Sequence, residues 1–320
     1  MGRPGGLFSS GPFAFHAITN CNRWPPLNQR RTFPMRSKLF VPGSRPELFE
    51  KAMRSAADAI SFDLEDAVVA DSKAEARAYV EEAIGRAVGS SRKTIIVRVN
   101  PVDGPLFEPD LEAIARPGLD VVNLPKIENA EAVHRASDIL ERLERKHGLE
   151  RRIGVLANIE TPRGLRRAAE IAASSDRIVG LQLGFGDLFE PLGIERSVAT
   201  LTPVWLAVRL AAAEAGVPAY DGAFVVVSDL AAFRAEAAAA RSVGFAGKSC
   251  VHPTQIEVAN AVFLPSAEQI EKARRIVSVA DEMAARGVGA FTVEGVMADG
   301  PFILRAREIL RIAELARDDV

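Results

Sequence analysis

The sequence predicts a (β/α)8 TIM barrel followed by a C-terminal helical arm. Three observations predict the barrel: short apolar runs recur along the chain, helix-like stretches rich in Ala, Glu and Arg separate them, and nearly all of the runs end in a polar or charged residue. The eight runs are residues 38–43, 60–66, 94–100, 121–126, 153–160, 178–187, 217–222 and 245–252. Such runs are typical of buried parallel strands that alternate with helices. Because the chemistry of these barrels lies at the carboxyl ends of the strands, the charged residues at those ends are the functional candidates.

The composition is that of an ordinary globular protein. The chain has 320 residues, 48% of them hydrophobic, and a formal net charge of −2. Neither a basic nucleic-acid surface nor a membrane span of about 20 apolar residues is therefore expected. The two cysteines, Cys21 and Cys250, give no disulfide framework and no metal-ligand spacing. We expect a protein of a reducing compartment, the cytoplasm.

Residues 1–34 differ from the rest of the chain. The first acidic residue is Glu47, and the stretch before it is rich in Arg, Gly, Pro and Ser without lasting periodicity. This composition resembles a transit peptide, which leaves a mitochondrial location open. The simpler interpretation is a disordered extension, or an upstream start codon with Met35 as the true start.

The barrel is expected to occupy residues 35–264. Pro46 begins the first helix, at a position where its missing N–H costs little. Residues 72–75 have the spacing of a capping box before the second helix. The Ala-rich stretch 231–241 predicts a helix that ends at Gly244.

The pattern changes in residues 265–320. A long amphipathic helix begins at Ser266, a glycine-bearing hairpin-like stretch covers 287–297, and a last helix covers 302–316. This segment is not a ninth barrel unit. We interpret it as an oligomerisation element and active-site lid; the alternative is a helical cap on its own barrel.

Glu160 and Asp187 end the fifth and sixth predicted strands. Neighbouring strands lie about 5 Å apart, so the two side chains can converge. Two carboxylates without Cys or His beside them suit Mg²⁺, which leaves its other positions to water and substrate oxygens. The alternative is that each carboxylate caps the next helix or pairs with an arginine.

Three acids, Asp63, Glu65 and Asp66, crowd the end of the second strand. Burying like charges is costly unless cations neutralise them, and such crowding can raise a carboxyl pKa toward values useful in acid–base catalysis. The alternative is a structural network with Arg77 or Arg98.

Cationic residues also lie at strand ends. Arg98 interrupts an apolar strand and therefore needs a partner, either a substrate carboxylate or thioester oxygen, or the acids of the second strand. Lys126 and Lys248 occupy positions where a Schiff-base aldolase would keep its nucleophile. His252, the one histidine at a strand end, suits loop positioning or ligand contact better than base catalysis.

Several segments, in order and spacing, resemble the citrate lyase β-subunit-like (CitE-like) branch of the HpcH/HpaI aldolase family. They are Arg36–Pro46, Phe62–Val68, Lys73–Arg77, Val97–Pro101, Leu124–Lys126, Ile159–Gly164, Gly184–Asp187, Gly244–Gln255 and Phe263–Pro265. The resemblance covers about residues 35–310. It implies a Mg²⁺-dependent carbon–carbon lyase that cleaves or forms a hydroxyacyl-CoA, such as citramalyl-, malyl- or citryl-CoA, with a keto acid and an acyl-CoA as products.

The resemblance also implies roles for individual residues. Glu160 and Asp187 match the metal ligands, and Arg98 matches the arginine that contacts the keto-acid and thioester groups. The acidic pair Glu65 and Asp66 lies near the reacting centre, and Asp299 matches an aspartate that family trimers offer to a neighbouring subunit's site. The predicted substrate-binding residues are Arg98, Gly184, Phe185, Pro125, Lys126 and His252, with His252 in the segment that lines the CoA path.

The chain departs from the family pattern at two places. Residues 184–187 read Gly-Phe-Gly-Asp where the family often has Gly-Ala-Glu-Asp, and Val296 replaces the more usual lysine near the presumed CoA. Both changes bear on substrate identity. Two alternative functions stay open: an aldolase for a free hydroxy-keto acid, and a β subunit of a citrate lyase complex that receives its acyl group on a carrier protein. The resemblance further implies a homotrimer or hexamer.

Overall fold

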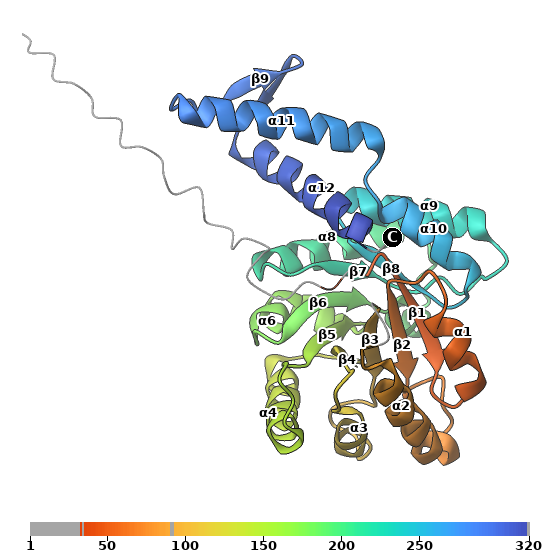
Figure 1. Cartoon of the computed structure of the whole chain (residues 1–320). Helices are drawn as coiled ribbons and strands as arrows, with labels where there is room; N and C mark the ends of the chain where they lie inside the picture. Colours follow the sequence, from red (N-terminus) through yellow and green to blue (C-terminus); the bar gives the residue numbers. More distant parts are fainter. Residues whose placement is uncertain (1–32, 34, 90–92, 319–320) are drawn as a thin grey trace, which may run out of the picture.

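A computed structural model describes residues 33, 35–89 and 93–318, and it confirms the predicted barrel (Figure 1). Eight parallel strands pair in chain order, and β1 pairs with β8 to close the ring. The strands are β1 Ser37–Pro42, β2 Ala59–Asp63, β3 Thr94–Arg98, β4 Val121–Leu124, β5 Gly154–Ile159, β6 Ile178–Leu183, β7 Ala219–Asp221 and β8 Gly247–Cys250. Each lies within or beside a predicted apolar run, because residues buried on both faces must be apolar on both.

The helices surround the strands as an outer layer. They are α1 Phe49–Met53, α2 Lys73–Ala87, α3 Phe107–Ile114, α4 Ala130–His147, α5 Pro162–Arg166, α6 Ala168–Ala173, α7 Phe185–Phe189, α8 Val198–Glu214, α9 Leu230–Val243 and α10 Thr254–Phe263, with short 3-10 turns at Pro46–Leu48, Ala70–Ser72 and Glu190–Leu192. None of the helices in the described ranges is long and apolar enough to cross a membrane.

Helix ends follow the predicted signals, with one exception. Pro46 opens the 3-10 turn that leads into α1, and α9 ends at Gly244, whose φ of 100° is left-handed. The capping box predicted at residues 72–75 is wrong, because the Ser72 side chain makes no capping hydrogen bond. Ser72 already belongs to a 3-10 turn, so its backbone is helical rather than extended as an N-cap requires.

The barrel lumen contains a polar layer above an apolar floor. The floor consists of Phe33, Met35, Ala59, Ile96, Val121, Leu156, Val179 and Tyr220. Above it, Ser61, Asn123, Gln182 and Ser249 project from the four even-numbered strands, and each is at most 2% exposed. Lys38, which pairs in register with Ser249, is 3% exposed, and its Nζ has no hydrogen-bond partner among the described residues. Burial, then the charge of Arg98, lowers the pKa of Lys38 well below its ordinary value.

The arm after the barrel has the predicted parts. Helix α11 (Ala267–Ala285) begins with a capping box at Ser266, β9 (Phe291–Val293) and β10 (Val296–Ala298) form an antiparallel hairpin, and α12 (Gly300–Asp318) returns along α11. Figure 1 shows the hairpin at the end of the arm that lies away from the barrel. Whether residues 265–320 form a separate functional unit stays a prediction. The predicted extension 1–34 lies outside the described residues, apart from Phe33, which packs in the lumen floor.

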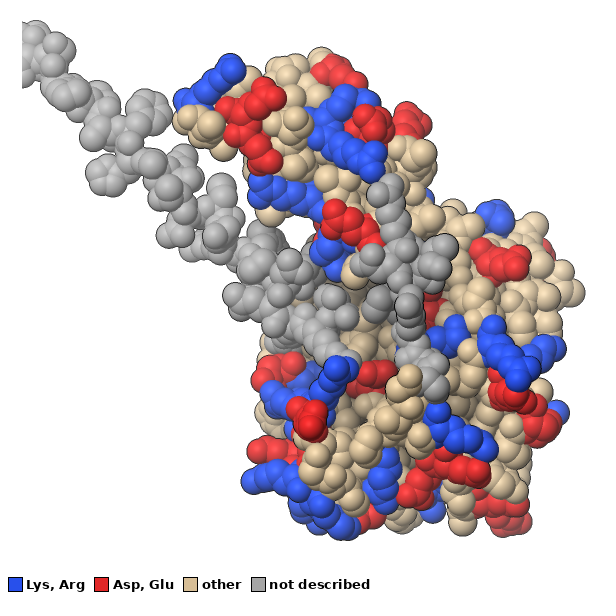
Figure 2. Space-filling model, in the orientation of Figure 1, with Lys and Arg blue, Asp and Glu red and all other residues tan. Residues whose placement is uncertain are grey.

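Positive and negative side chains alternate on the molecular surface. On the face drawn in Figure 2, Lys and Arg lie among Asp and Glu over both the barrel and the arm. The two signs of charge are therefore interspersed on this face.

Candidate active site

The candidate site begins with an arginine fork at the carboxyl ends of β2 and β3. Arg98 and Asp63 are in register on neighbouring strands. The Arg98 Nε donates to Asp63 Oδ1 at 2.8 Å and Nη2 donates to Asp63 Oδ2 at 2.6 Å. Burial alone would raise the pKa of Asp63, but the hydrogen bonds and charge of Arg98 lower it. Of the two predicted partners for Arg98, the acids of the second strand are therefore the ones that the structure shows; Arg77 instead pairs with Asp110.

Glu65 lies between two cations. Its Oε2 is 2.8 Å from Arg98 Nη1, and its Oε1 accepts a hydrogen bond from Lys126 Nζ at 2.6 Å. Glu65 is 3% exposed, so burial and then the charge of Asp66 raise its pKa, despite both cations. The loop after β2 thus supplies one buried acid and one solvent-facing acid, since the Asp66 side chain is 56% exposed.

Lys126 connects this cluster with the two predicted metal ligands. Its backbone N–H donates to Glu160 Oε1 at 2.7 Å, and its Nζ lies 3.5 Å from Asp187 Oδ1 and 3.6 Å from Asp66 Oδ1. The backbone of Lys126 is left-handed, with φ of 50°, which is uncommon for a residue other than glycine and is typical of functional sites. Burial opposes the charged form, but Glu65, Asp66 and Asp187 together raise the pKa of Lys126. A Schiff-base nucleophile needs a lowered pKa, so this geometry argues against that role.

Glu160 follows β5 and is buried against β6. Burial raises its pKa to about 7, and the charges of Glu65 and Asp187 add to that effect. The carboxylate fits only because residue 184 is a glycine: a Cβ there would lie 2.1 Å from Glu160 Oε2 and 2.6 Å from Glu160 Cβ. Gly184 therefore leaves the space that the Glu160 side chain occupies. This is a structural reason for a glycine at a position that the sequence analysis predicted to bind substrate.

Asp187 lies in the first turn of α7, and its side chain is 39% exposed. The two carboxylates differ in exposure but share Lys126, so one is anchored and the other faces solvent. The described residues contain no group of three or more His, Cys, Asp or Glu side chains that could hold a metal ion. A buried carboxylate with a raised pKa beside a second carboxylate nevertheless suits Mg²⁺, which proteins often bind through one or two carboxylates with water completing the shell.

The other predicted residues lie around or away from this cluster. Pro125 is buried between β4 and Lys126. The Phe185 ring does not face the cluster: it is 2% exposed and packs against Phe189 and Trp205 in the helix layer. The substrate-contact prediction for that side chain is therefore not supported. His252 is exposed and bonds to Thr254 in the loop after β8.

Lys248 is directed away from the lumen and does not join the site. Its Nζ lies within hydrogen-bonding distance of Asp221 and Glu236, and Trp205 Nε1 donates to Asp221 at 2.8 Å. A fully buried side chain held by two carboxylates has a structural role, which argues against the Schiff-base alternative for Lys248.

Asp299 lies between β10 and α12, on the arm, whose hairpin end Figure 1 shows away from β3 and β5, the strands that end at Arg98 and before Glu160. Its Oδ1 is buried without a hydrogen-bond partner among the residues that the structure describes. The fold of one chain thus separates Asp299 from the cluster.

One contributor to the site escaped the sequence analysis. Lys73, at the start of α2, donates to the backbone oxygens of Leu64 and Glu65 and to Asn100 Oδ1 at 2.6–2.8 Å. It fixes the loop that carries Glu65 and Asp66. Lys73 belongs to the segment 73–77 that resembles the family, and this was the sequence feature that could have identified it. By itself, however, that segment is typical of an ordinary helix start.

Comparisons with known proteins show the family of the chain. The family model described as HpcH/HpaI aldolase/citrate lyase matches residues 36–253. The chain is 39% identical to the citrate lyase subunit beta of Escherichia coli, over 91% of this chain and 97% of that protein. It is 35% identical to the L-malyl-CoA/beta-methylmalyl-CoA lyase of Cereibacter sphaeroides, over 88% of this chain and 95% of that protein. A crystal structure of CitE from Mycobacterium tuberculosis with magnesium, acetoacetate and coenzyme A superposes with a TM-score of 0.68, at 33% identity, over 87% of this chain and 97% of that chain.

Proposed function

The chain belongs to the HpcH/HpaI aldolase/citrate lyase family, and we propose that it is a Mg²⁺-dependent carbon–carbon lyase. Its substrate would be a hydroxyacyl-CoA of the citramalyl, malyl or citryl type, and its products a keto acid and an acyl-CoA. The observation that carries the proposal is the convergence of Glu160, Asp187 and Glu65 on Lys126 at the carboxyl ends of the strands. Magnesium and coenzyme A in a 33% identical structure support the choice of cofactor and thioester.

Glu160 and Asp187 would hold the Mg²⁺. When bound, the ion would supply a positive charge for the carboxylate and carbonyl oxygens of the keto acid. Glu160 Oε1 accepts a hydrogen bond from the Lys126 N–H, which would hold the carboxylate in one orientation for the ion. A ligand fixed in this way limits the number of arrangements the ion can adopt, as supporting hydrogen bonds do in known metal sites.

The chain's own residues would move the protons and stabilise charge. In cleavage, a base takes the hydroxyl proton, the carbon–carbon bond electrons pass to the thioester as an enolate, and an acid protonates the enolate carbon. Asp66 is the solvent-facing acid beside both cations, which suits it to act as the base that takes the hydroxyl proton. Arg98 Nη1, which Asp63 does not engage, lies 2.8 Å from Glu65 Oε2, and its positive charge would stabilise the enolate oxygen.

Asp299 would supply the second proton from a neighbouring subunit. Its unpartnered buried oxygen and its place on the arm support a role in another chain's site rather than its own. An Asp299→Asn chain and an Arg98→Lys chain, each inactive alone, should then regain activity when mixed and reassembled, because some sites combine an intact barrel with an intact arm. Mixed oligomers that remain inactive would contradict this role.

The reaction itself is tested with purified protein, Mg²⁺ and a panel of hydroxyacyl-CoAs. Keto acid released with Mg²⁺ and abolished by EDTA is the expected result, and the fastest panel member identifies the acyl group. Glu160→Gln should lose this release, whereas Glu150→Gln, an exposed change outside the cluster, should keep it. Cleavage of free hydroxy-keto acids without cleavage of any thioester would assign the aldolase alternative instead.

A second candidate function is that of a β subunit within a citrate lyase complex. The 39% identity to such a subunit favours it. The same panel distinguishes the two: a carrier-protein thioester that is cleaved while the matching CoA thioester is not would establish the subunit role.

A further inference from the structure

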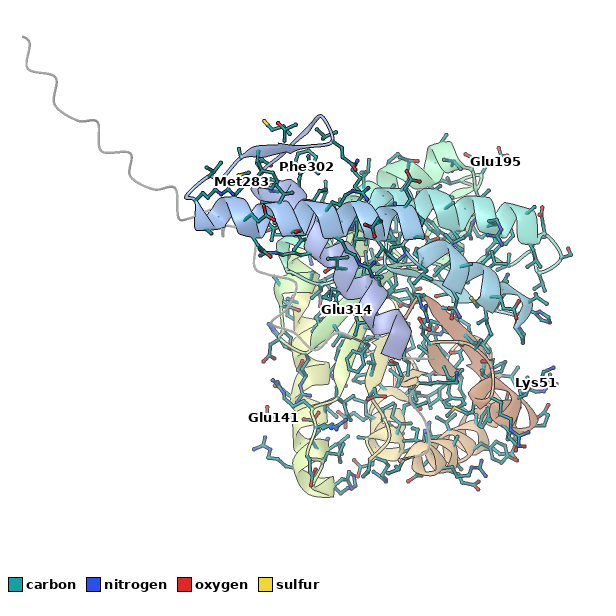
Figure 3. All side chains as sticks on the ribbon, turned by 45° about the horizontal axis from the view of Figure 1, so that its top comes forward. Lys51, Glu141, Glu195, Met283, Phe302 and Glu314 are labelled. Carbon is teal, nitrogen blue, oxygen red and sulfur yellow. The ribbon has the colours of Figure 1, made fainter. Side chains whose placement is uncertain are left out.

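A cavity of about 320 Å³ lies at the end of the barrel opposite to the candidate active site. Residues at the amino ends of β1, β7 and β8 line one side of it, and the later turns of α12 line the other. Figure 3 shows Glu314 of α12 over the barrel, whereas Phe302 and Met283 lie at the outer end of the arm. The arm thus forms one side of this chamber and its own barrel forms the other.

The chamber walls are partly apolar. The apolar lining includes Phe33, Met35, Phe245, Phe263, Leu304 and Ile312. This volume is at the lower end of the range of small-molecule sites, about 300–1,000 Å³. Apolar walls with a few charged groups are the usual design of such sites.

Three arginines from three helices face the chamber without a carboxylate partner among the described residues: Arg209 of α8, Arg241 of α9 and Arg305 of α12. Arg209 Nη1 is buried and has no hydrogen-bond partner there, and Arg241 bonds only to the neutral Gln269, at 2.7 Å. The lining carboxylate Glu308 is already held by Arg311, through two hydrogen bonds of 2.7 and 2.8 Å.

The charge of Arg305 also repels each of the other two guanidinium groups, and the charge of Glu308 opposes this effect at Arg209. Burial and then the charge of Arg305 lower the pKa of both Arg209 and Arg241. Gly244, which ends α9, allows this approach, because a Cβ there would lie 3.0 Å from Arg209 Nε. Arg209 and Arg241 are half-buried and Arg305 is exposed, and three like charges gathered around one cavity favour an anion between them.

We propose that this chamber is a binding site for an organic anion, whose carboxylate or phosphate group is held by Arg209, Arg241 and Arg305 and whose apolar body lies against the phenylalanines and leucine of the wall. The chain that precedes the barrel cannot supply this group from a side chain, because its first acidic residue is Glu47. The site is separate from the proposed lyase centre and does not depend on it.

Calorimetric titration of the full chain tests the proposal with hexanoate, hexyl phosphate, hexan-1-ol and inorganic phosphate. We expect one of the two hexyl anions, or both, to bind at one site per chain, and the preferred head group to be the one with the lower Kd. Hexan-1-ol should bind at least tenfold more weakly, because hydrogen bonds to charged groups contribute about 1.5–3 kcal/mol. Hexan-1-ol binding as tightly as the anions would overturn the proposal, as would no binding by either anion.

Two variants connect the binding to the arginines. Arg305→Met and Arg209→Met should each raise the Kd tenfold or more, while Arg307→Met should leave it unchanged, because Arg307 is on the same helix but pairs with Asp281. Arg305 is exposed, so its variant tests the site even if the Arg209 variant fails to fold. Equal affinity in Arg305→Met and Arg307→Met would refute the assignment. Binding that appears only after residues 317–320 are removed would also overturn it, because the chain's own terminal carboxylates would then be the occupant.

Discussion

Replacing Gly184 by alanine should displace the Glu160 carboxylate and weaken Mg²⁺ binding. The new Cβ would lie 2.1 Å from Glu160 Oε2 and 2.6 Å from Glu160 Cβ, against an ordinary contact of 3.4–4 Å. The side chain must therefore move by more than about 1 Å. Because the closest atoms include Glu160 Cβ, rotation of the carboxylate alone cannot relieve the clash.

The expected loss follows from that displacement. Misplacing a catalytic group by about 1 Å can cost roughly 100-fold in rate, and disturbing the support of a metal ligand typically costs 10- to 100-fold in affinity. We expect the Kd for Mg²⁺ to rise by about 10- to 100-fold, or about 1.4–2.7 kcal/mol. Overpacking should also lower the free energy of unfolding by about 1–3 kcal/mol.

Titration of Mg²⁺ into the purified variant, followed by calorimetry, measures the effect. Gly186→Ala is the matched control, since a Cβ at Gly186 meets nothing within 4 Å and the residue lies in α7, the short helix that begins after Gly184. Gly184→Ala with the affinity of the wild type, in a protein whose thermal unfolding shows that it is folded, would refute the geometric argument for Glu160 as a ligand.

Three further predictions concern the arginine fork and two buried residues of the barrel strands. Arg98→Lys cannot keep two hydrogen bonds to Asp63, so kcat/KM for thioester cleavage should fall by about 100-fold or more; unchanged kinetics would exclude Arg98 from the site. Lys38→Met should raise the free energy of unfolding at pH 7 by about 1–3 kcal/mol, because it removes a buried amine without a partner. Since folding lowers the pKa of Lys38, wild-type stability rises with pH. The difference between variant and wild type in urea unfolding should therefore be smaller at about pH 10 than at pH 7. Burial raises the pKa of Cys250 to about 12, so this thiol contributes stability below about pH 9 that is lost above it, by up to about 1.4 kcal/mol per pH unit. Cys250→Ala should therefore make the free energy of unfolding fall less steeply above about pH 9, and an unaltered slope would count against the buried neutral thiol.

The sequence predicted the barrel well because its strands are short apolar runs that end in charged residues. The ends of β2, β3, β5 and β6 were predictable for the same reason, since parallel strands bring their carboxyl ends to one side. Pair identities were harder to predict: strand alternation could not show that Arg98 would engage Asp63 twice and leave one nitrogen for Glu65.

The direction of a side chain relative to the barrel wall was hard to predict from the sequence. Phe185 follows the end of β6 and Lys248 lies within β8, yet both side chains are directed toward the helix layer. A shift of one position decides between lumen and helix layer, because side chains alternate along a strand. Composition cannot resolve that difference, whereas the paired strands in the structure do.

The pairing of β1 with β8 has a consequence for the newly made chain. Lys248 lies 211 positions after Ser37, its partner in the closed ring. At roughly 5–20 residues per second, translation therefore leaves the outer edge of β1 unpaired for about 10–40 seconds. That edge belongs to the apolar sequence Leu-Phe-Val, and unpaired apolar edges promote aggregation. Slower growth at low temperature or a holding chaperone should consequently raise the yield of recombinant protein more than any change at the active site.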